Sequence, residues 1–118
     1  MDVADTYLDG NADAVEFCPH VGFENILAAS TYTLHETPID NPTRLGSISL
    51  FDVDVETRRL ELVHRVESAG IFDIRWSPLG SCDHIGPLLA QADADGYLRI
   101  HALLQSPGFI YSQFYIVV

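Results

Sequence analysis

The chain has 118 residues, and its 17 acidic side chains outnumber its 6 basic ones, which gives a formal net charge of −11. A charge of this sign repels phosphate backbones and argues against nucleic acid as the main partner. All six basic residues are arginine, so none of them can supply the lysine of a Schiff base or of a phosphate-binding P-loop.

The N-terminal residues predict a short strand followed by a turn. Val3 to Leu8 has strand-like composition, and Asp9-Gly10-Asn11 is a turn signal. The acidic start has neither the basic region nor the apolar core of a signal peptide, and no apolar run approaches the ~20 residues of a membrane span. We therefore expect a cytoplasmic protein with no membrane partner.

One sequence pattern occurs twice in the chain. AVEFCP (Ala14 to Pro19) and DIRWSP (Asp73 to Pro78) each end in proline, which lacks the N–H that a strand ladder needs. Each is followed by a small apolar run and by an alternating strand that opens with glycine. These segments are Ile26 to Ser30, Leu88 to Ala92, Gly46 to Val53 and Gly96 to Leu103. Strand units of this kind bury their faces only against neighbours, so the pattern predicts a repeat architecture.

Three further segments complete the prediction. Residues 31–45 contain two prolines with Asp and Asn, which predicts a long loop. Leu60 to Val66 alternates apolar and charged residues, which indicates an outer strand. Gly108 to Val118 is almost wholly apolar, and two interpretations stay open: a fourth strand of the second unit, or sequence foreign to the repeat, such as a retained intron. We favour the second, because an outer strand normally keeps one polar face.

These elements predict an all-β fold built as an incomplete propeller of about two blades. A propeller needs about 40–45 residues for each of typically 4–8 blades, so we interpret the chain as a fragment. We assign residues 1–10 to a strand of a closing blade and residues 11–66 to the first blade. Residues 67–107 form the second, incomplete blade, and residues 108–118 are a tail of doubtful origin. No helix is expected.

Candidate catalytic residues are scarce. The chain has no Gly-x-Ser-x-Gly motif, so we interpret Ser30 and Ser77 as strand and turn residues rather than nucleophiles. Asp93 to Gly96 matches the start of a calcium loop, but the later oxygen ligands and the closing Glu are missing. We interpret this segment as a turn.

Two Cys-x-His pairs offer a zinc interpretation. Cys18 with His20 and Cys82 with His84 would together supply four ligands. Structural zinc sites usually show closely spaced cysteines, so we favour two reduced thiols and expect no metal.

Histidine is the side chain that most readily acts as a general base near neutral pH. His20 and His35 are the better candidates, because both are expected in loops of the first unit. His64 is expected on a sheet face. The remaining histidines are His84 and His101. These positions do not single out a catalytic residue.

The second unit resembles the repeat of WD-repeat propellers. GIFDIRWSPLG (Gly70 to Gly80) and ADADGYLRIHA (Ala92 to Ala102) are similar to a unit whose inner strand ends in aromatic-Ser-Pro and whose Asp/Gly turn precedes an alternating strand. The departures are a missing Gly-His pair, replaced by Ser68-Ala69-Gly70, and a missing Trp-Asp pair. Phe51-Asp52 and His101-Ala102 stand in its place.

A narrower resemblance runs from about Asp5 to Leu104. The order and spacing of Asp5 to Pro19, Ile26 to Leu34 and Arg44 to Val53 resemble the N-terminal part of the WD-repeat diphthine methylesterases. This resemblance implies hydrolysis of a methyl ester on the modified histidine of elongation factor 2 during diphthamide synthesis, without a cofactor. Its substrate carries a trimethylammonium group, which an acidic surface with an aromatic residue such as Tyr32 would attract.

The resemblance assigns no catalytic residues and leaves other function classes open. The chain is expected to be an inactive piece of the hydrolase, because most of the ring is absent. Alternatively, the repeats form a non-catalytic scaffold for protein–protein interaction. A third possibility is that short chains build a ring by self-association.

Overall fold

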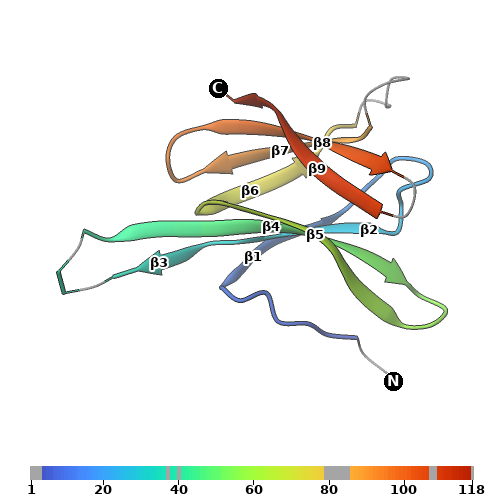
Figure 1. The fold of residues 1–118 in the computed structure, drawn as a ribbon, viewed down its shortest axis with the longest axis horizontal. Coiled ribbons are helices and arrows are strands. Elements are labelled where there is room, and N and C mark those ends of the chain that lie inside the picture. Colours follow the sequence, from blue (N-terminus) through green and yellow to red (C-terminus); the bar gives the residue numbers. More distant parts are fainter. Residues whose placement is uncertain (1–3, 37, 40, 79–85, 107–108, 118) are drawn as a thin grey trace.

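The computed structural model describes residues 4–36, 38–39, 41–78, 86–106 and 109–117. These residues form nine strands and no helix, which confirms the predicted all-β class. The strands lie in two antiparallel sheets that are stacked as layers and do not close into a ring (Figure 1). Within the described ranges there is accordingly no helix long and apolar enough to cross a membrane.

The first sheet contains five strands. They are β1 (Ala12–Phe17), β2 (Ile26–Thr31), β3 (Thr33–His35), β4 (Thr43–Asp54) and β5 (Arg59–Ala69). β2 pairs with β1 and β4, and β5 pairs with the other side of β4. The predicted outer strand is thus present, and it extends to Ala69.

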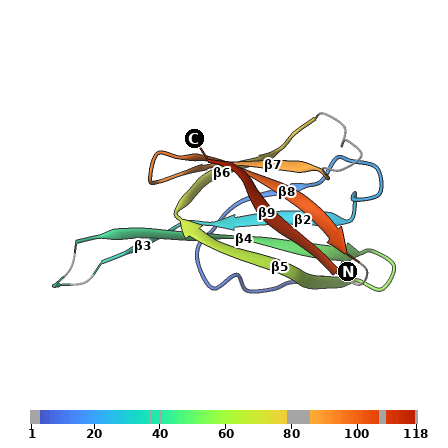
Figure 2. The same ribbon diagram turned by 45° about the horizontal axis from the view of Figure 1, so that its top comes forward.

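The predicted loop at residues 31–45 is partly wrong, because a short ribbon forms there. β3 pairs with the beginning of β4, with Thr33 opposite Leu45 and His35 opposite Thr43. Pro38 and Pro42 lie outside this ladder, where the missing N–H costs no ladder hydrogen bond. The ribbon projects beyond the rest of the sheet (Figure 2).

The second sheet contains four strands in sequence order. They are β6 (Ile71–Trp76), β7 (Leu88–Asp93), β8 (Leu98–Ser106) and β9 (Phe109–Val117). The apolar tail pairs antiparallel with β8 as the fourth strand, which is the alternative that we did not favour. We had expected an outer strand to keep one polar face. That expectation was wrong here because a β-prone run can pair with any open strand edge. The origin of the tail remains a prediction.

Residues 4–11 form no strand, in contrast to the strand expected from Val3 to Leu8. The segment passes along the side of the first sheet that faces away from the second (Figure 1). Leu8 is half-buried there, while Tyr7 is exposed. A strand requires a partner edge, and among the described residues the segment meets the first sheet only at its end, where the Asn11 carbonyl accepts a hydrogen bond of 3.1 Å from the N–H of Tyr32. Its assignment to a closing blade, and the placement of Val3, lie beyond what the described residues test.

The two sheets repeat each other in hydrogen-bond register. Phe17 pairs with Leu27 in the first sheet, and Trp76 pairs with Leu89 at the same place in the second. Register shifts fall at matching points in β1 and β6, and again where β4 meets β5 and where β8 meets β9. The duplication seen in the sequence is therefore a duplication of backbone structure.

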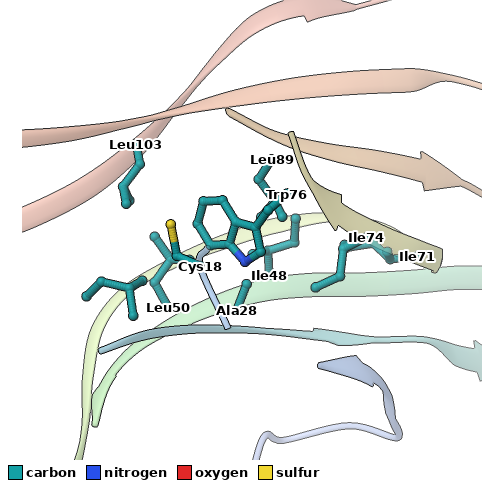
Figure 3. Packing of buried hydrophobic residues seen from close by; sticks show 10 residues of the cluster. Cys18, Ala28, Ile48, Leu50, Ile71, Ile74, Trp76, Leu89 and Leu103 are labelled. Carbon is teal, nitrogen blue, oxygen red and sulfur yellow. The ribbon is translucent and has the colours of Figure 1, made fainter. Parts of the chain in front are cut away.

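Apolar side chains from both sheets fill the space between the layers (Figure 3). The cluster comprises Cys18, Ile26, Ala28, Ile48, Leu50, Ile71, Ile74, Trp76, Leu89 and Leu103. Trp76 is 5% exposed, and its Nε1–H donates a hydrogen bond of 3.0 Å to the carbonyl oxygen of Glu16. One side chain thus supplies both apolar burial and a polar link between the layers.

Phe17 occupies in β1 the place that Trp76 has in β6, yet it is 53% exposed. The second sheet covers only one face of the first, and Phe17 lies on the other face. The two residues therefore share a backbone position and differ in their neighbours.

A single residue, Gly70, joins the two sheets. Its N–H donates to the carbonyl of Arg44 in the first sheet at 2.9 Å, and its carbonyl accepts from the N–H of Ala94 at 2.8 Å. A Cβ at this position would lie 2.8 Å from the ring of Tyr32. Glycine is therefore required by close packing rather than by a turn conformation.

Replacing Trp76 should destabilise the fold more than any exposed substitution. Trp76→Ala is expected to lower the free energy of unfolding by about 3–5 kcal/mol, because it empties the centre of the interlayer core. Trp76→Phe keeps most of the apolar contact and should cost about 1–2 kcal/mol, since the Glu16 carbonyl loses its donor. Urea denaturation followed by circular dichroism measures both.

Val55→Ala is the control, because Val55 lies exposed in the turn between β4 and β5 and should change stability by less than about 0.5 kcal/mol. Equal effects of Trp76→Ala and Val55→Ala would contradict the assignment of Trp76 to the core.

Candidate functional site

The second sheet buries a connected set of polar side chains beside the turn between β7 and β8. Asp93 ends β7 and accepts hydrogen bonds on both carboxylate oxygens. Arg99 Nε donates to Oδ2 at 2.7 Å, and Gln91 Nε2 donates to the same oxygen at 3.1 Å. The backbone N–H groups of Asp95 and Tyr97 donate to Oδ1 at 3.0 and 3.2 Å.

The environment of Asp93 keeps its carboxyl group ionised. Burial by itself raises the pKa, but the hydrogen bonds from Arg99 and from the backbone of Tyr97 and Asp95 hold the pKa below its ordinary value. Asp93 therefore fixes the turn and is no proton donor at neutral pH. This agrees with the sequence interpretation of Asp93 to Gly96 as a turn.

Gln91 connects this turn to the first sheet and to His101. Gln91 Nε2 donates to the Ser68 hydroxyl at 2.8 Å, and that hydroxyl donates to the carbonyl of Ala69 at 2.8 Å. Gln91 Oε1 accepts a hydrogen bond of 2.9 Å from His101 Nε2. Because both donor hydrogens of the amide are already used, Oε1 must accept, which places the His101 proton on Nε2.

His101 is a poor candidate for a general base. Burial, followed by the charges of Arg99 and His64, lowers its pKa to about 4. A base with such a pKa accepts protons weakly near neutrality. With only 1% of its surface exposed, His101 acts as a neutral hydrogen-bonding residue inside the sheet.

This network connects the two positions at which the second unit departs from the WD-repeat pattern that its sequence resembles. Ser68 stands where the Gly-His pair is missing, and His101 stands where the Trp-Asp pair is missing. Gln91 bridges them. The sequence analysis overlooked Gln91, although a lone polar residue in the apolar run LLAQA signals a buried polar contact.

An open cavity of about 490 Å³ lies between the N-terminal segment and the first sheet. Its lining includes Tyr7, Asp9, Thr31, Arg65, Glu67 and Ser68. Carboxylates, a guanidinium and hydroxyls suit the binding of a polar ligand. Among the described residues that line it there is neither a cysteine nor a histidine, and the Ser68 hydroxyl is already bonded on both sides. The described lining residues thus place no nucleophile beside a cysteine or histidine in this cavity.

The two candidate serines occupy structural positions. Ser30 is completely buried in β2, and its hydroxyl lies 3.5 Å from the carbonyl oxygen of Ala14 in β1. Substrate could not reach it without opening the sheet. Ser77 follows β6, and its main-chain N–H and carbonyl form hydrogen bonds with Leu88 and His20.

Cys18 and His20 lie beside the second sheet rather than at an open site. Cys18 is a buried free thiol, and burial raises its pKa, so it is protonated at neutral pH. His20 Nε2 donates to the carbonyl of Ser77 at 2.7 Å. Cys82 and His84 fall outside the described residues, so the four-ligand zinc interpretation cannot be compared with the structure. The described part of the chain contains no group of three ligand-type side chains suited to a metal.

The other candidates are dispersed. His35 ends β3 on the exposed ribbon, and His64 is half-buried in β5, where the sequence placed it. Tyr32 links β2 to β3, and its ring centroid lies 5.2 Å from that of Phe72. The structure thus brings Tyr32 next to another aromatic residue. It also brings the candidate base His20 against Ser77, but the contact joins His20 Nε2 to the main-chain carbonyl of Ser77.

Two known proteins share the sequence of this chain over most of its length. Diphthine methyltransferase of Mus musculus is 31% identical over 115 residues, which cover 89% of this chain and 23% of that protein. Diphthine methyltransferase of Homo sapiens is 31% identical over 123 residues, which cover 90% and 26% respectively. The chain is therefore similar, over about nine-tenths of its length, to one part of the diphthine methyltransferases.

This finding confirms the family resemblance that the sequence indicated. The chain spans about a quarter of the length of these relatives. No protein-family profile matches it. No solved structure matches it either.

The buried network should be sensitive to the charge of Asp93. Asp93→Asn places an amide donor against the donors of Gln91 and Arg99, and we expect it to lower the free energy of unfolding by about 2–4 kcal/mol. Asp95→Asn is the matched control, because it makes the same change two residues away on an exposed side chain and should cost less than about 0.5 kcal/mol. Thermal and urea denaturation compare the two variants, and equal losses would contradict the network.

His101 should make stability depend on pH in a defined window. Its pKa is about 4 when folded and 6.5 ordinarily. Between these values the unfolded chain binds the extra proton, so the free energy of unfolding falls as pH drops from 6.5 to 4, by up to about 3 kcal/mol. His101→Phe introduces the residue type that the first sheet has at the equivalent position, Phe51, and should remove this part of the slope. An unchanged slope in urea titrations across this range would show that His101 is not responsible.

Proposed function

We propose that the chain is part of a cytoplasmic diphthamide-pathway enzyme that hydrolyses the methyl ester of diphthine methyl ester on elongation factor 2. The observation that carries this proposal is the 31% identity to two diphthine methyltransferases over about nine-tenths of the chain. We expect the chain by itself to be inactive, because two sheets are only part of a propeller ring.

We also propose that the two sheets are neighbouring blades of a WD-repeat propeller. Three observations support this architecture: the shared register of the sheets, the single-residue link between them, and the apolar core that joins their faces. Repeating the relation between the two sheets would add further blades on either side. The ring would then carry the catalytic groups at its assembled centre.

Methyl transfer is the second candidate reaction. The names of both relatives indicate a transferase, whereas the sequence resemblance indicates an esterase. Hydrolysis removes the methyl group, whereas transfer adds one from a donor. A labelled methyl group therefore distinguishes the two reactions. In either case the net charge of −11 would attract the trimethylammonium group of diphthine at long range.

The deciding experiment follows a radiolabelled methyl group with the full-length protein. Elongation factor 2 carrying labelled diphthine methyl ester should release labelled methanol in amounts stoichiometric with the ester. The 118-residue chain at equal concentration should release no more than buffer does. Incorporation of label from a methyl donor into unesterified elongation factor 2 would instead favour transfer. Binding of elongation factor 2 without either reaction would favour a non-catalytic scaffold.

A further inference from the structure

The last strand of the second sheet has one open edge. β9 pairs with β8 on one side, and among the described residues no strand pairs with its other side. Such an edge presents backbone N–H and C=O groups that can pair with another strand. Sheets that stack cover each other's faces, as the second sheet covers the first, and leave the edges of their outer strands uncovered. The edge of β9 is therefore open whether or not further sheets follow.

β9 lacks the residues that usually keep an open edge from pairing. Natural edge strands commonly carry charged residues or proline for this purpose. β5 is the outer strand of the first sheet, and it contains four charged residues, Arg59, Glu61, Arg65 and Glu67. The nine residues of β9 include no charged residue and no proline. The two sheets thus repeat each other in pairing but differ in the protection of their outer strands.

The negative charge of the chain is also absent from this part of the sequence. All 17 acidic residues lie at or before Asp95, so β8 and β9 contain none. Arg99 is the only Asp, Glu, Lys or Arg residue between Leu98 and Val117. Two chains that approach each other through β9 therefore bring no carboxylates together at the contact, although each chain carries a net charge of −11.

The sequence of β9 is nearly symmetric about Gln113. Tyr111 and Tyr115 lie two residues from it on either side, and Ile110 and Ile116 lie three residues from it. If two β9 strands pair antiparallel about a two-fold axis at Gln113, each of these residues lies opposite its own residue type. Tyr115, which the ladder with β8 skips, then lies opposite Tyr111 of the other copy. Cross-strand pairs of aromatic and of β-branched residues stabilise antiparallel ladders.

We propose that β9 pairs antiparallel with β9 of a second copy of this chain, with Gln113 opposite Gln113. The contact joins the second sheets of both copies into one continuous sheet, with four strands from each copy. A two-fold contact uses the same edge of both copies, so it is complete with two chains and does not grow further. The pairing needs neither methyl-ester chemistry nor a closed ring, and it therefore stands or falls separately from the proposed function.

Charges placed at the two-fold axis test the pairing. Gln113→Lys and Gln113→Glu each put two like charges opposite each other, so each variant should dimerise about fivefold more weakly than the unmodified chain. An equimolar mixture of the two variants puts a positive charge opposite a negative one. Its one-to-one dimer should be at least as tight as the unmodified dimer. Sedimentation equilibrium from micromolar to submillimolar concentration measures the dissociation constants.

Val21→Lys and Val21→Glu are the matched controls, because Val21 is 92% exposed in a loop and the same charges there should leave dimerisation unchanged. Circular dichroism verifies that every variant keeps the β-sheet content of the unmodified chain. Hydrogen exchange locates the contact. Amides of β9 that exchange readily in the monomer should exchange more slowly as the dimer forms, whereas those of β5 should not change.

Four results would overturn the proposal. The first is an unmodified chain that remains monomeric over the whole concentration range. The second is growth beyond the dimer, which would indicate an open-ended contact. The third is a dimer of undiminished strength in both Gln113 variants, which would place the contact elsewhere. The fourth is a mixture of the two variants that associates no more tightly than either variant alone.

Discussion

The structure depends on the packing of one sheet against the other through Trp76. Its ring lies in the centre of the interlayer core, and its N–H reaches the backbone of Glu16 in the facing sheet. A flat aromatic residue with one polar edge suits this position, because the rest of the ring contacts only apolar neighbours. The hydrogen bond also sets how far β6 slides along β1. Apolar contact alone would fix the distance between the layers but not their lateral alignment.

The two sheets share a backbone plan but stabilise it differently. The second sheet buries the Gln91, Asp93 and His101 network, whereas the first has Thr31 at the position of Asp93 and Phe51 at the position of His101. In the first sheet, the hydroxyl groups of Thr31 and Ser47 form a hydrogen bond of 3.0 Å. Buried polar networks stabilise only when every member has a partner. The two repeats therefore hold the same backbone plan with different buried side chains.

Sequence periodicity was sufficient to predict the strand pattern, because strands need only alternation and turn residues. It located the segments that became β2, β4, β5, β7 and β8 within a few residues. It failed at β3 and at residues 4–11, where pairing depends on which edges lie nearby. The network around Gln91 was also missed, although most of its members lie in the β7–β8 hairpin, because alternation alone does not show which inward-facing polar side chains bond to one another. The catalytic groups of the proposed reaction could not be predicted from residue spacing, because the chain contains no nucleophile motif.

The link at Gly70 has a geometric consequence. Its N–H is bonded to the first sheet and its carbonyl to the N–H of Ala94 beside the second, so the connection has no freedom to act as a hinge. The angle between the two sheets is then fixed by the few backbone atoms that bond at Gly70. If further sheets are joined by the same kind of link, the angle at this link determines how many sheets close a ring. A slightly wider angle would close the ring with fewer sheets, and a narrower angle with more.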